Sequence, residues 1–438
     1  MPDGWAWERL GNITTIARGG SPRPIKSYLT TELDGVNWIK IGDTEKNGKY
    51  IFSTKEKIKP EGIAKSRYVK SGDFLLTNSM SFGRPYILKT DGCIHDGWLM
   101  IGNTEIVFNQ DYLYYALSSD FMYNMLSVLA GGSTVDNLNS DLVKSLLFPI
   151  PPMQEQFIIA NKAESLMEIV DTINNNEKEL LKNIKSIKSK ILDLAIRGKL
   201  VPQDPNDEPA SVLLERIRAE KEELIKQGKI KRDKKESVIF KGEDNSYYLR
   251  TDKLIESLDD WRFDELPDNW SLCCLGEICD YGNCINVDSS SIAESAWILD
   301  LEDIEKDTGI VLKKIKKSER NAASTKHLFH KGQVLYSKLR PYLNKVVLAD
   351  EDGYCTSEIL PLDFSEIIVP EYARYFLMSP TFLRYANKCS YGVKMPRLGT
   401  TDGKKAILSL PPIEEQKRIV IAIEKAFSLL SSIIENLS

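Results

Sequence analysis

Short apolar runs recur along two stretches of the chain. NWIKIGD from Asn37, DFLLTN from Asp73 and QVLYSKL from Gln333 are rich in residues that favour strands. Gly, Asn and Asp residues, which favour turns, separate these runs. The pattern predicts sheets of short strands in both stretches.

Two other segments carry a helical pattern. From Asp111 and from Glu371, aromatic and apolar residues recur at helical spacing. The pattern stops at the Gly131-Gly132 pair in the first segment and at Gly392 in the second. Each stretch is therefore predicted to be an α/β mixture in which a helix ended by glycine leads into a polar loop.

The two stretches are copies of one another. Four motifs occur twice in the same order, and the offset between copies drifts only from about 265 to about 260 residues. The pairs are PDGWAWERLGNI at Pro2 and PDNWSLCCLGEI at Pro267, KSGDFLLTNSMSFGRPYIL at Lys70 and HKGQVLYSKLRPYLNKVVL at His330, DYLYYALSSDFMYNML at Asp111 and EYARYFLMSPTFLRYA at Glu371, and FPIPPMQEQ at Phe148 and LSLPPIEEQ at Leu408. In the second pair, the first copy carries a few extra residues before Arg-Pro-Tyr. Repeats of this kind indicate a duplicated domain of about 150 residues.

The repeat divides the chain into five parts. We predict a first domain over residues 1–150, a long helix over 151–200, a charged helix and linker over 201–260, a second domain over 261–410 and a short helix over 411–438. Asp207-Glu208-Pro209 and Gly228 frame the charged helix. The basic, polar run that follows is typical of a linker.

Each proline motif marks a helix start. Pro152 and Pro412 fit a first turn that tolerates a missing N–H, and glutamates follow where the helix dipole favours carboxylates. The first helix should cover about 45 residues, roughly 70 Å at about 1.5 Å per residue. Its apolar stripe has the alternating three- and four-residue spacing of a coiled coil. The stripe runs through Leu166, Val170, Ile173, Leu180, Ile184, Ile187, Ile191 and Leu194.

The second helix carries the same spacing but is about half as long. Its stripe consists of Val420, Ile423, Phe427, Leu430, Ile434 and Leu437. Two narrow stripes in one chain most simply pair with each other, which would hold the two domains at a fixed distance. The alternative is that each helix packs back on its own domain.

Composition excludes several classes of protein. The chain has 438 residues, 42% apolar and 28% charged, and no stretch approaches the roughly 20 apolar residues of a membrane span. It shows no secretion signal, and its seven scattered cysteines form no disulfide framework, so we expect a cytoplasmic protein. The net charge of −5 does not indicate nucleic-acid binding, although a groove needs only a local basic face.

Common catalytic motifs do not occur. The sequence contains no phosphate-binding loop, dinucleotide-binding glycine turn or H-E-x-x-H motif, and the three histidines occupy unmatched places in the two copies. Cys273, Cys274, Cys279 and Cys284 could be read as a zinc site, but their spacing fits apolar packing better. Asp402-Gly403-Lys404 matches only half of a nuclease signature.

Three motifs lie where the repeated domains and the helices meet. They are FPIPPMQEQ, LSLPPIEEQ and the stretch ILDLAIRGKLVPQDPNDEPASVLLERI after the first long helix. With the order of domain, helix, domain, helix, these motifs make the chain resemble the DNA-specificity subunits of type I restriction-modification systems. The resemblance covers essentially the whole chain.

The resemblance implies an α/β (α+β) fold with two tandem target-recognition domains, each reading one half of a bipartite site in double-stranded DNA. The long helices would form an antiparallel coiled coil that sets the spacer and docks two methyltransferase subunits, to which restriction-translocase subunits attach. The chain itself would be non-catalytic, without cofactor or metal, and would have no membrane partner. S-adenosylmethionine, ATP and Mg are expected on the partner subunits.

Two equivalent loops in each copy carry the side chains that suit base edges and phosphates. The second loop leads into the last strand of its domain and contains glycine, which permits close backbone approach. We predict DNA contacts from Asn78, Ser79, Ser81, Arg84, Ser133, Thr134 and Asn137 in the first copy, and from Ser337, Lys338, Arg340, Tyr342, Tyr391, Lys394, Arg397 and Lys404 in the second.

Two other functions remain open from the residues alone. The chain could be a tandem-domain scaffold whose coiled coil binds proteins and whose domains bind no DNA. It could also be a nuclease, which metal-dependent cleavage by the isolated chain would reveal.

Overall fold

Two compact units make up the chain, Met1–Asn175 and Asn176–Ser438. We call them the first unit and the second unit, and each contains one copy of the repeat. The computed structural model describes residues 2–45, 48–78, 82–130, 138–229, 238–244, 246–251, 254–258, 266–320, 324–364, 366 and 368–437.

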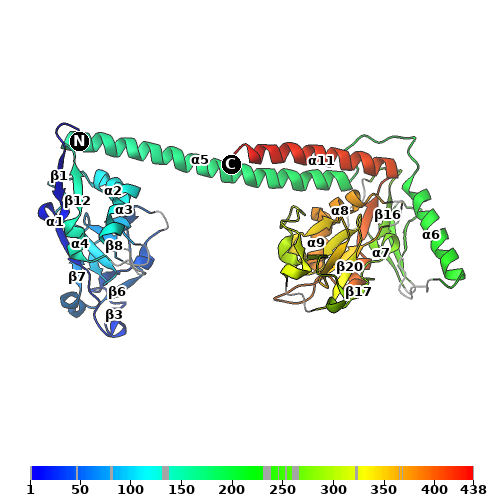
Figure 1. Ribbon diagram of the computed structural model, residues 1–438, viewed down its shortest axis with the longest axis horizontal. Coiled ribbons are helices and arrows are strands. Elements are labelled where there is room, and N and C mark those ends of the chain that lie inside the picture. Colours follow the sequence, from blue (N-terminus) through cyan, green and yellow to red (C-terminus); the bar gives the residue numbers. More distant parts are fainter. Residues whose placement is uncertain are drawn as a thin grey trace. The chain divides into compact units, whose positions relative to one another are not determined.

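The described residues of the first unit form two five-stranded sheets and four short α-helices (Figure 1). The strands are β1 (Ala6–Arg9), β2 (Thr15–Arg18), β3 (Leu29–Thr30), β4 (Val36–Ile39), β5 (Tyr50–Ile51), β6 (Glu56–Ile58), β7 (Arg67–Val69), β8 (Phe74–Thr77), β9 (Pro85–Leu88), β10 (Gly92–Ile94), β11 (Trp98–Gly102) and β12 (Leu147–Ile150). The helices are α1 (Leu10–Ile13), α2 (Gln110–Ser118), α3 (Asp120–Leu129) and α4 (Ser140–Ser145). The sheet orders are β3-β6-β4-β10-β7 and β2-β11-β8-β9-β5, and β1 pairs with β12.

Strand β8 shows how the layers of the first unit are built. All four of its residues are buried, as expected of a strand covered on both faces. Phe74 and Leu76 pack with residues of α2 and α3, whereas Leu75 packs with residues of the other five-stranded sheet. Because successive side chains of a strand point to opposite faces, one strand serves two cores.

The second unit repeats this plan and adds elements of its own. Its strands are β13 (Val238–Lys241), β14 (Tyr247–Thr251), β15 (Leu254–Ser257), β16 (Ser271–Cys274), β17 (Asn286–Val287), β18 (Trp297–Leu299), β19 (Ile315–Lys316), β20 (Lys326–Phe329), β21 (Val334–Ser337), β22 (Val346–Leu348), β23 (Gly353–Thr356), β24 (Ile359–Leu362) and β25 (Ile407–Leu410). Its shorter helices are α6 (Ala210–Lys226), α7 (Leu275–Ile278), α8 (Pro370–Met378), α9 (Pro380–Cys389) and α10 (Thr400–Lys404). The sheet orders are β17-β20-β23-β18-β19 and β22-β21-β24, and β16 pairs with β25 as β1 pairs with β12.

Strand β21 is the counterpart of β8. Val334 and Tyr336 pack with residues of α8 and α9, and Leu335 packs with residues of the five-stranded sheet. The α/β fold predicted for each copy is therefore confirmed, with the same division of one strand between two cores.

The segments expected to form one helix after Asp111 and Glu371 each form two. The break falls at Ser119 in the first copy and at Ser379 in the second, where the hydroxyl accepts a hydrogen bond from a backbone N–H of the following helix. A serine that caps a new helix ends the preceding helix without disturbing the spacing of the apolar residues. That spacing therefore gave no sign of the break between the two helices.

Part of the stretch expected as a linker is a sheet. Strands β13, β14 and β15 form an antiparallel meander. Ile239 of β13 packs against Leu272 and Cys274 of β16, which attaches the meander to the second copy of the repeat. The charged helix predicted before it is confirmed as α6.

A buried glutamine fastens each long helix to its domain. These helices are α5 (Met153–Ile196) and α11 (Ile413–Glu435). Gln156, 1% exposed, accepts a hydrogen bond from Asn109 N at 2.7 Å, and Gln416, fully buried, accepts one from Val369 N at 2.8 Å. Each glutamine also donates to the carbonyl of the proline five residues before it, at 3.0 Å. Asn109 and Val369 are the residues at which α2 and α8 begin.

The glutamate before each glutamine binds the tryptophan of the opening motif. Trp5 Nε1 donates to Glu155 at 3.0 Å, and Trp270 Nε1 donates to Glu415 at 2.9 Å. In the second unit Glu415 also accepts from Gln203 at 2.6 Å, so the segment after α5 joins the same cluster. The first and last motifs of each copy thus meet where the long helix begins.

Helix α5 begins in the first unit and ends in the second, where α11 lies antiparallel to its last turns (Figure 1). Lys188 Nζ lies 5.3 Å from the ring centre of Phe427. Ser409, just before α11, donates to Ile196 O at 2.6 Å. A residue just before α11 thus meets the end of α5, and a later residue of α11 meets an earlier turn of α5, which confirms the predicted antiparallel pair.

The predicted stripe of α5 is buried only in part. Ile184 is 3% exposed, but Ile187 is 47% exposed, and Leu166, Val170, Ile173 and Leu180 are all at least 36% exposed. Because α11 has 23 residues and α5 has 44, α11 covers only part of α5. Within this chain, the paired seam therefore occupies only part of the stripe on α5, as expected from a second helix about half as long.

We predict that Ile184→Asp lowers the free energy of unfolding of the second unit by about 3 kcal/mol, because the substitution buries a carboxylate without a partner. Ile187→Asp, one turn away on the exposed side, should cost less than about 1 kcal/mol. Urea unfolding of the two variants provides the measurement. Equal losses would contradict the pairing described above.

Candidate nucleic-acid interface

Two loops of the second unit cross at the end of strand β21. Lys338 O accepts a hydrogen bond from Leu398 N at 3.0 Å, and Arg340 N donates to Pro396 O at 2.7 Å. Loop 338–345 and loop 390–399, which were predicted separately, therefore form one surface.

The short helix η8 (Pro341–Leu343) shapes the first of these loops. The residues on either side of it, Arg340 and Asn344, have left-handed φ angles of 50° and 49°. Such angles are unfavourable for residues with a side chain and occur where surrounding contacts hold them. The resulting turn leaves the ring of Tyr342 46% exposed.

Arg397 holds the second loop rather than projecting from it. Its guanidinium forms hydrogen bonds to both carboxylate oxygens of Glu358, at 2.8 to 3.1 Å, and a further one to Met395 O at 3.2 Å. Tyr391 and Lys394 are exposed on the same loop. With the arginine fixed against Glu358, these two side chains are the ones exposed to solvent.

The first unit contains the same crossing. Asn78 N donates to Gly97 O at 3.1 Å and Asn78 O accepts from Leu138 N at 3.0 Å, as Lys338 does with Glu358 and Leu398. The Asn78 side chain is 2% exposed and donates to Asp96 O at 2.8 Å, so it supports the loop from inside. Of the remaining predicted contacts in this copy, Ser79, Ser81, Ser133, Thr134 and Asn137 lie outside the described residues.

The Arg-Pro-Tyr triplets of the two copies are not equivalent. Thr77 N donates to Arg84 O and Ser337 N donates to Lys345 O, so the structural counterpart of Arg84 is Lys345. Pro85 begins strand β9, whereas Arg340 precedes η8, several residues before β22. The prediction of extra residues before Arg-Pro-Tyr in the first copy is therefore wrong. The two triplets have the same residue types but occupy different positions along the backbone.

The other predicted residues differ in exposure. Arg84 is exposed, and Lys338 is partly exposed. Ser337 is 3% exposed and donates to Leu339 O at 3.0 Å, so it faces inward. Lys404, at the end of α10, is partly buried against Gly276.

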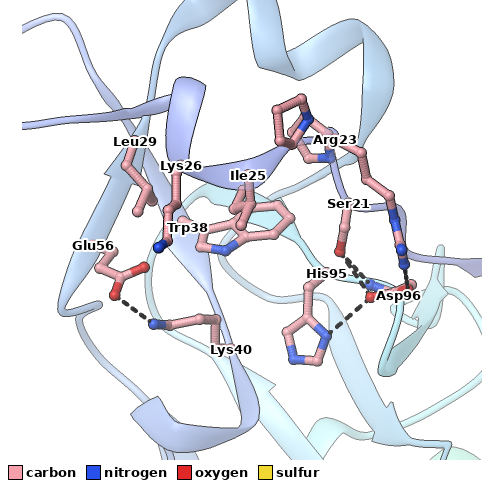
Figure 2. A pocket seen from close by; sticks show the side chains of 12 residues that line it. Ser21, Arg23, Ile25, Lys26, Leu29, Trp38, Lys40, Glu56, His95 and Asp96 are labelled. Carbon is pink, nitrogen blue, oxygen red and sulfur yellow. Dashed lines mark hydrogen bonds and ion pairs between the residues drawn. The ribbon is translucent and has the colours of Figure 1, made fainter.

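A cavity of 920 Å³ adjoins the crossing in the first unit (Figure 2). Trp38 forms part of its wall, and two ion pairs flank it, Lys40 with Glu56 at 2.8 Å and Arg23 with Asp96 at 3.3 Å. Through Asp96 the cavity is linked to Asn78 and hence to the loop predicted to contact DNA. Its charged rim was missed from the sequence.

The overlooked signal was the segment GGSPRPIK, which combines turn-forming residues with Arg23 and Lys26. The second copy has no matching segment, so the repeated motifs gave no indication of this part of the site.

His95 lines the same cavity and holds its turn together. Its Nδ1 lies 2.8 Å from Gly97 N, and its Nε2 lies 3.2 Å from Ile41 N. Burial lowers the pKa of His95, although Asp96 acts in the opposite direction. A neutral ring can accept a hydrogen bond from one of these two backbone N–H groups, whereas a protonated ring would present an N–H to both, so the neutral ring suits this place better.

The described residues contain no group of three or more His, Cys, Asp or Glu side chains placed to hold a metal ion. Cys273, Cys274 and Cys279 are buried free thiols, which fits packing rather than the zinc site considered above. No helix in the described ranges combines the length and apolarity that a bilayer crossing requires.

Comparison with known proteins identifies related chains. A family model described as the type I restriction modification DNA specificity domain matches residues 2–183 and 267–438. The specificity subunits of the type I restriction enzymes EcoAI and EcoEI from Escherichia coli are 33% identical over 57% of this chain and 24% identical over 98% of it. The alignments span 40% of the EcoAI subunit, 65% of the EcoDI subunit and 78% of the EcoEI subunit.

Two solved structures share the fold. One is a chain from a study of assembly and conformational transition of the type I R-M system, with a TM-score of 0.68 and 17% identity. The other is the HsdS subunit from Thermoanaerobacter tengcongensis, with a TM-score of 0.52 and 18% identity. Each comparison covers 100% of this chain and 93% of the other chain.

We predict that acid destabilises the first unit through His95. The unfolded histidine has a pKa of about 6.5, and the folded pKa is lower, so the unfolded chain binds the proton more readily. The stability contributed by the neutral ring is present above about pH 6.5 and is lost as the pH falls through the folded pKa.

Thermal unfolding of the wild type and of His95→Gln at pH 8 and pH 5.5 measures this effect. The wild type should lose more stability between the two pH values than His95→Gln does. His330→Gln, at an exposed histidine of the second unit, is the control and should behave as the wild type does. Equal losses in the wild type and His95→Gln would exclude His95 as the responsible group.

Proposed function

We propose that this chain, which belongs to the type I restriction modification DNA specificity family, selects the DNA sequence on which a type I restriction-modification complex acts. The observation that supports this function is the repeated crossing of two loops, one crossing in each unit, built on the same backbone hydrogen bonds. A repeated scaffold with two different surfaces suits two different half-sites.

Each unit would read one half of a bipartite site in double-stranded DNA. Base edges are read by side chains that reach into a groove, whereas phosphates are bound by charge and by backbone N–H groups. The crossing provides a rigid base, since the backbone of one loop is bonded to the backbone of the other. The exposed side chains of that surface are then positioned with little loss of conformational entropy on binding.

Among the predicted contacts, the exposed ones are the best candidates for reading DNA. They are Arg84 in the first unit and Tyr342, Tyr391 and Lys394 in the second. Lys338 and Arg340 lie at the crossing itself, and Asn78, Ser337 and Arg397 would support the loops. Ser79, Ser81, Ser133, Thr134, Asn137 and Lys404 remain proposed contacts.

The long helices would dock two methyltransferase subunits and set the spacer between half-sites. Support comes from the uncovered apolar side chains of α5, where Leu166, Met167, Ile169 and Ile173 are all at least half exposed. Contiguous exposed apolar surface marks a protein interaction site. Restriction-translocase subunits would join through the methyltransferase subunits, which would bring S-adenosylmethionine, ATP and Mg. This chain would carry no catalytic centre.

Mapping of methylated adenines in a host with and without this chain tests the function. The host must express the methyltransferase subunits and no other specificity subunit. We expect methylation at a split motif with a fixed spacer, only when the chain is present. An assembled complex that methylates no split motif would favour the scaffold, and metal-dependent cleavage by the isolated chain would favour the nuclease.

We predict that Lys394→Glu weakens binding of the assembled complex to its DNA by about tenfold and lowers the salt slope by about one, because an exposed cation beside a phosphate is reversed. Affinity measured at several salt concentrations gives both quantities. Lys331→Glu is the matched control, since Lys331 is an exposed lysine in the turn at the opposite end of strand β21.

The control should bind as the wild type does. If Lys394→Glu and Lys331→Glu behave alike, loop 390–399 does not face the DNA.

A further inference from the structure

Three lysines share one face of α5 in the second unit. Lys178, Lys182 and Lys185 follow one another at four- and three-residue spacing, which places them on the same side of a helix. Glu177 and Glu179, the nearest acidic residues of the same turns, fall on other faces because each residue rotates the helix by about 100°. Over the turns from Lys178 to Lys185, the charged side chains of this face are therefore all basic.

Lys185 connects this face to the loop crossing. Its Nζ lies 2.7 Å from Asp307, whose backbone N donates to Leu343 O at 3.2 Å. Leu343 belongs to η8, the turn that leaves Tyr342 exposed. One ion pair and one hydrogen bond thus link the basic face to the surface proposed to read DNA.

The basic face continues the side of α5 that packs on the second unit. Two and three turns after Lys185, Leu192 and Ile196 are buried in the main core of that unit. Lys178 and Lys182 lie further toward the start of the helix and are exposed. Neither forms a hydrogen bond or ion pair with the rest of the chain as far as the structure describes it. The side of α5 that packs against the core at Leu192 is therefore exposed to solvent and positively charged at Lys182.

A further exposed lysine lies beside Asp307, the residue that joins the helix to the crossing. Lys306 precedes Asp307 in the chain and is exposed. Asp307 is paired with Lys185, so the positive charges of Lys178, Lys182 and Lys306 are not offset by this carboxylate. Lys306 lies beside the residue bonded to the turn at Tyr342, and Lys178 and Lys182 lie on α5. We call these three lysines the basic track.

We propose that this track binds the phosphates of the DNA between the two half-sites. The inference rests on the proposed function and extends it from the half-sites to the spacer. In this proposal, a duplex leaving the crossing would pass Lys306 and then α5, where Lys178 and Lys182 are about 6 Å apart along the helix axis. Lysines at this spacing reach separate phosphates and release counterions without reading sequence. The spacer would then add affinity while its sequence stays free.

The test compares two double variants of the full chain assembled with its methyltransferase subunits. Lys178→Gln with Lys182→Gln removes two charges from the basic face. Lys162→Gln with Lys190→Gln removes two exposed charges from other faces of the same helix. Glutamine and lysine have similar helix propensities, so both variants should keep α5 intact. Helix content by circular dichroism and complex size verify this before binding is measured.

Binding is measured against salt on the split site that the wild type recognises and on a duplex with one half-site replaced. For Lys178→Gln with Lys182→Gln we expect the salt slope to fall by about two, with the ratio between the two duplexes unchanged. Lys162→Gln with Lys190→Gln should keep the wild-type slope. On a duplex whose spacer phosphates are neutral methylphosphonates, the wild type and the first variant should bind alike.

The inference is overturned if the two double variants have the same salt slope. It is also overturned if the first variant loses methyltransferase subunits while its salt slope stays at the wild-type value, because the face then binds protein. Failure of the proposed function has a different signature, in which the wild-type complex shows no preference for any split site.

Discussion

The buried glutamine at the start of each long helix is the contact on which the architecture depends. Gln156 and Gln416 each bridge the backbone at the start of a domain helix and the carbonyl of a proline before the long helix. A buried amide that satisfies backbone donors and acceptors on both sides is costly to break, since each partner would remain buried without a hydrogen bond. The joint therefore gives the helix a defined direction relative to its own domain.

A shared scaffold with separate surfaces follows from this joint. Both copies divide one strand between two cores, begin a helix at the same serine, and cross two loops through the same backbone hydrogen bonds. None of these contacts uses the exposed side chains of the loops. Arg84 and Lys345 can therefore differ in identity and in partners at equivalent positions without disturbing either core. Separation of the groups that hold the loops from those that face the solvent would allow one domain to be duplicated and redirected to a second DNA sequence.

Most of the architecture could be predicted from local patterns, and the site could be predicted only as two loops. The duplication, both long helices and the α/β character of each copy were visible because periodicity and motif order survive divergence. The break at Ser119 was not visible, since a capped serine leaves the apolar spacing intact. Asn78, Ser337 and Arg397 have the chemistry of DNA contacts, yet their side chains face the protein, and no local pattern distinguishes these two uses. The cavity rim at Arg23 and Lys40 was missed because it joins segments that are distant in the chain.

The sequence by itself determined that this chain is a tandem repeat with a helix after each copy, and that it resembles a DNA-specificity subunit. These features depend on residues near one another in the chain, where propensity and spacing act directly. The tertiary structure decided which polar side chains are supports and which are exposed, that α11 covers only the end of α5, and that a basic face of α5 adjoins the crossing in the second unit. Those outcomes depend on which distant segments meet, because a charge or an amide takes its role from the partner that packing places beside it.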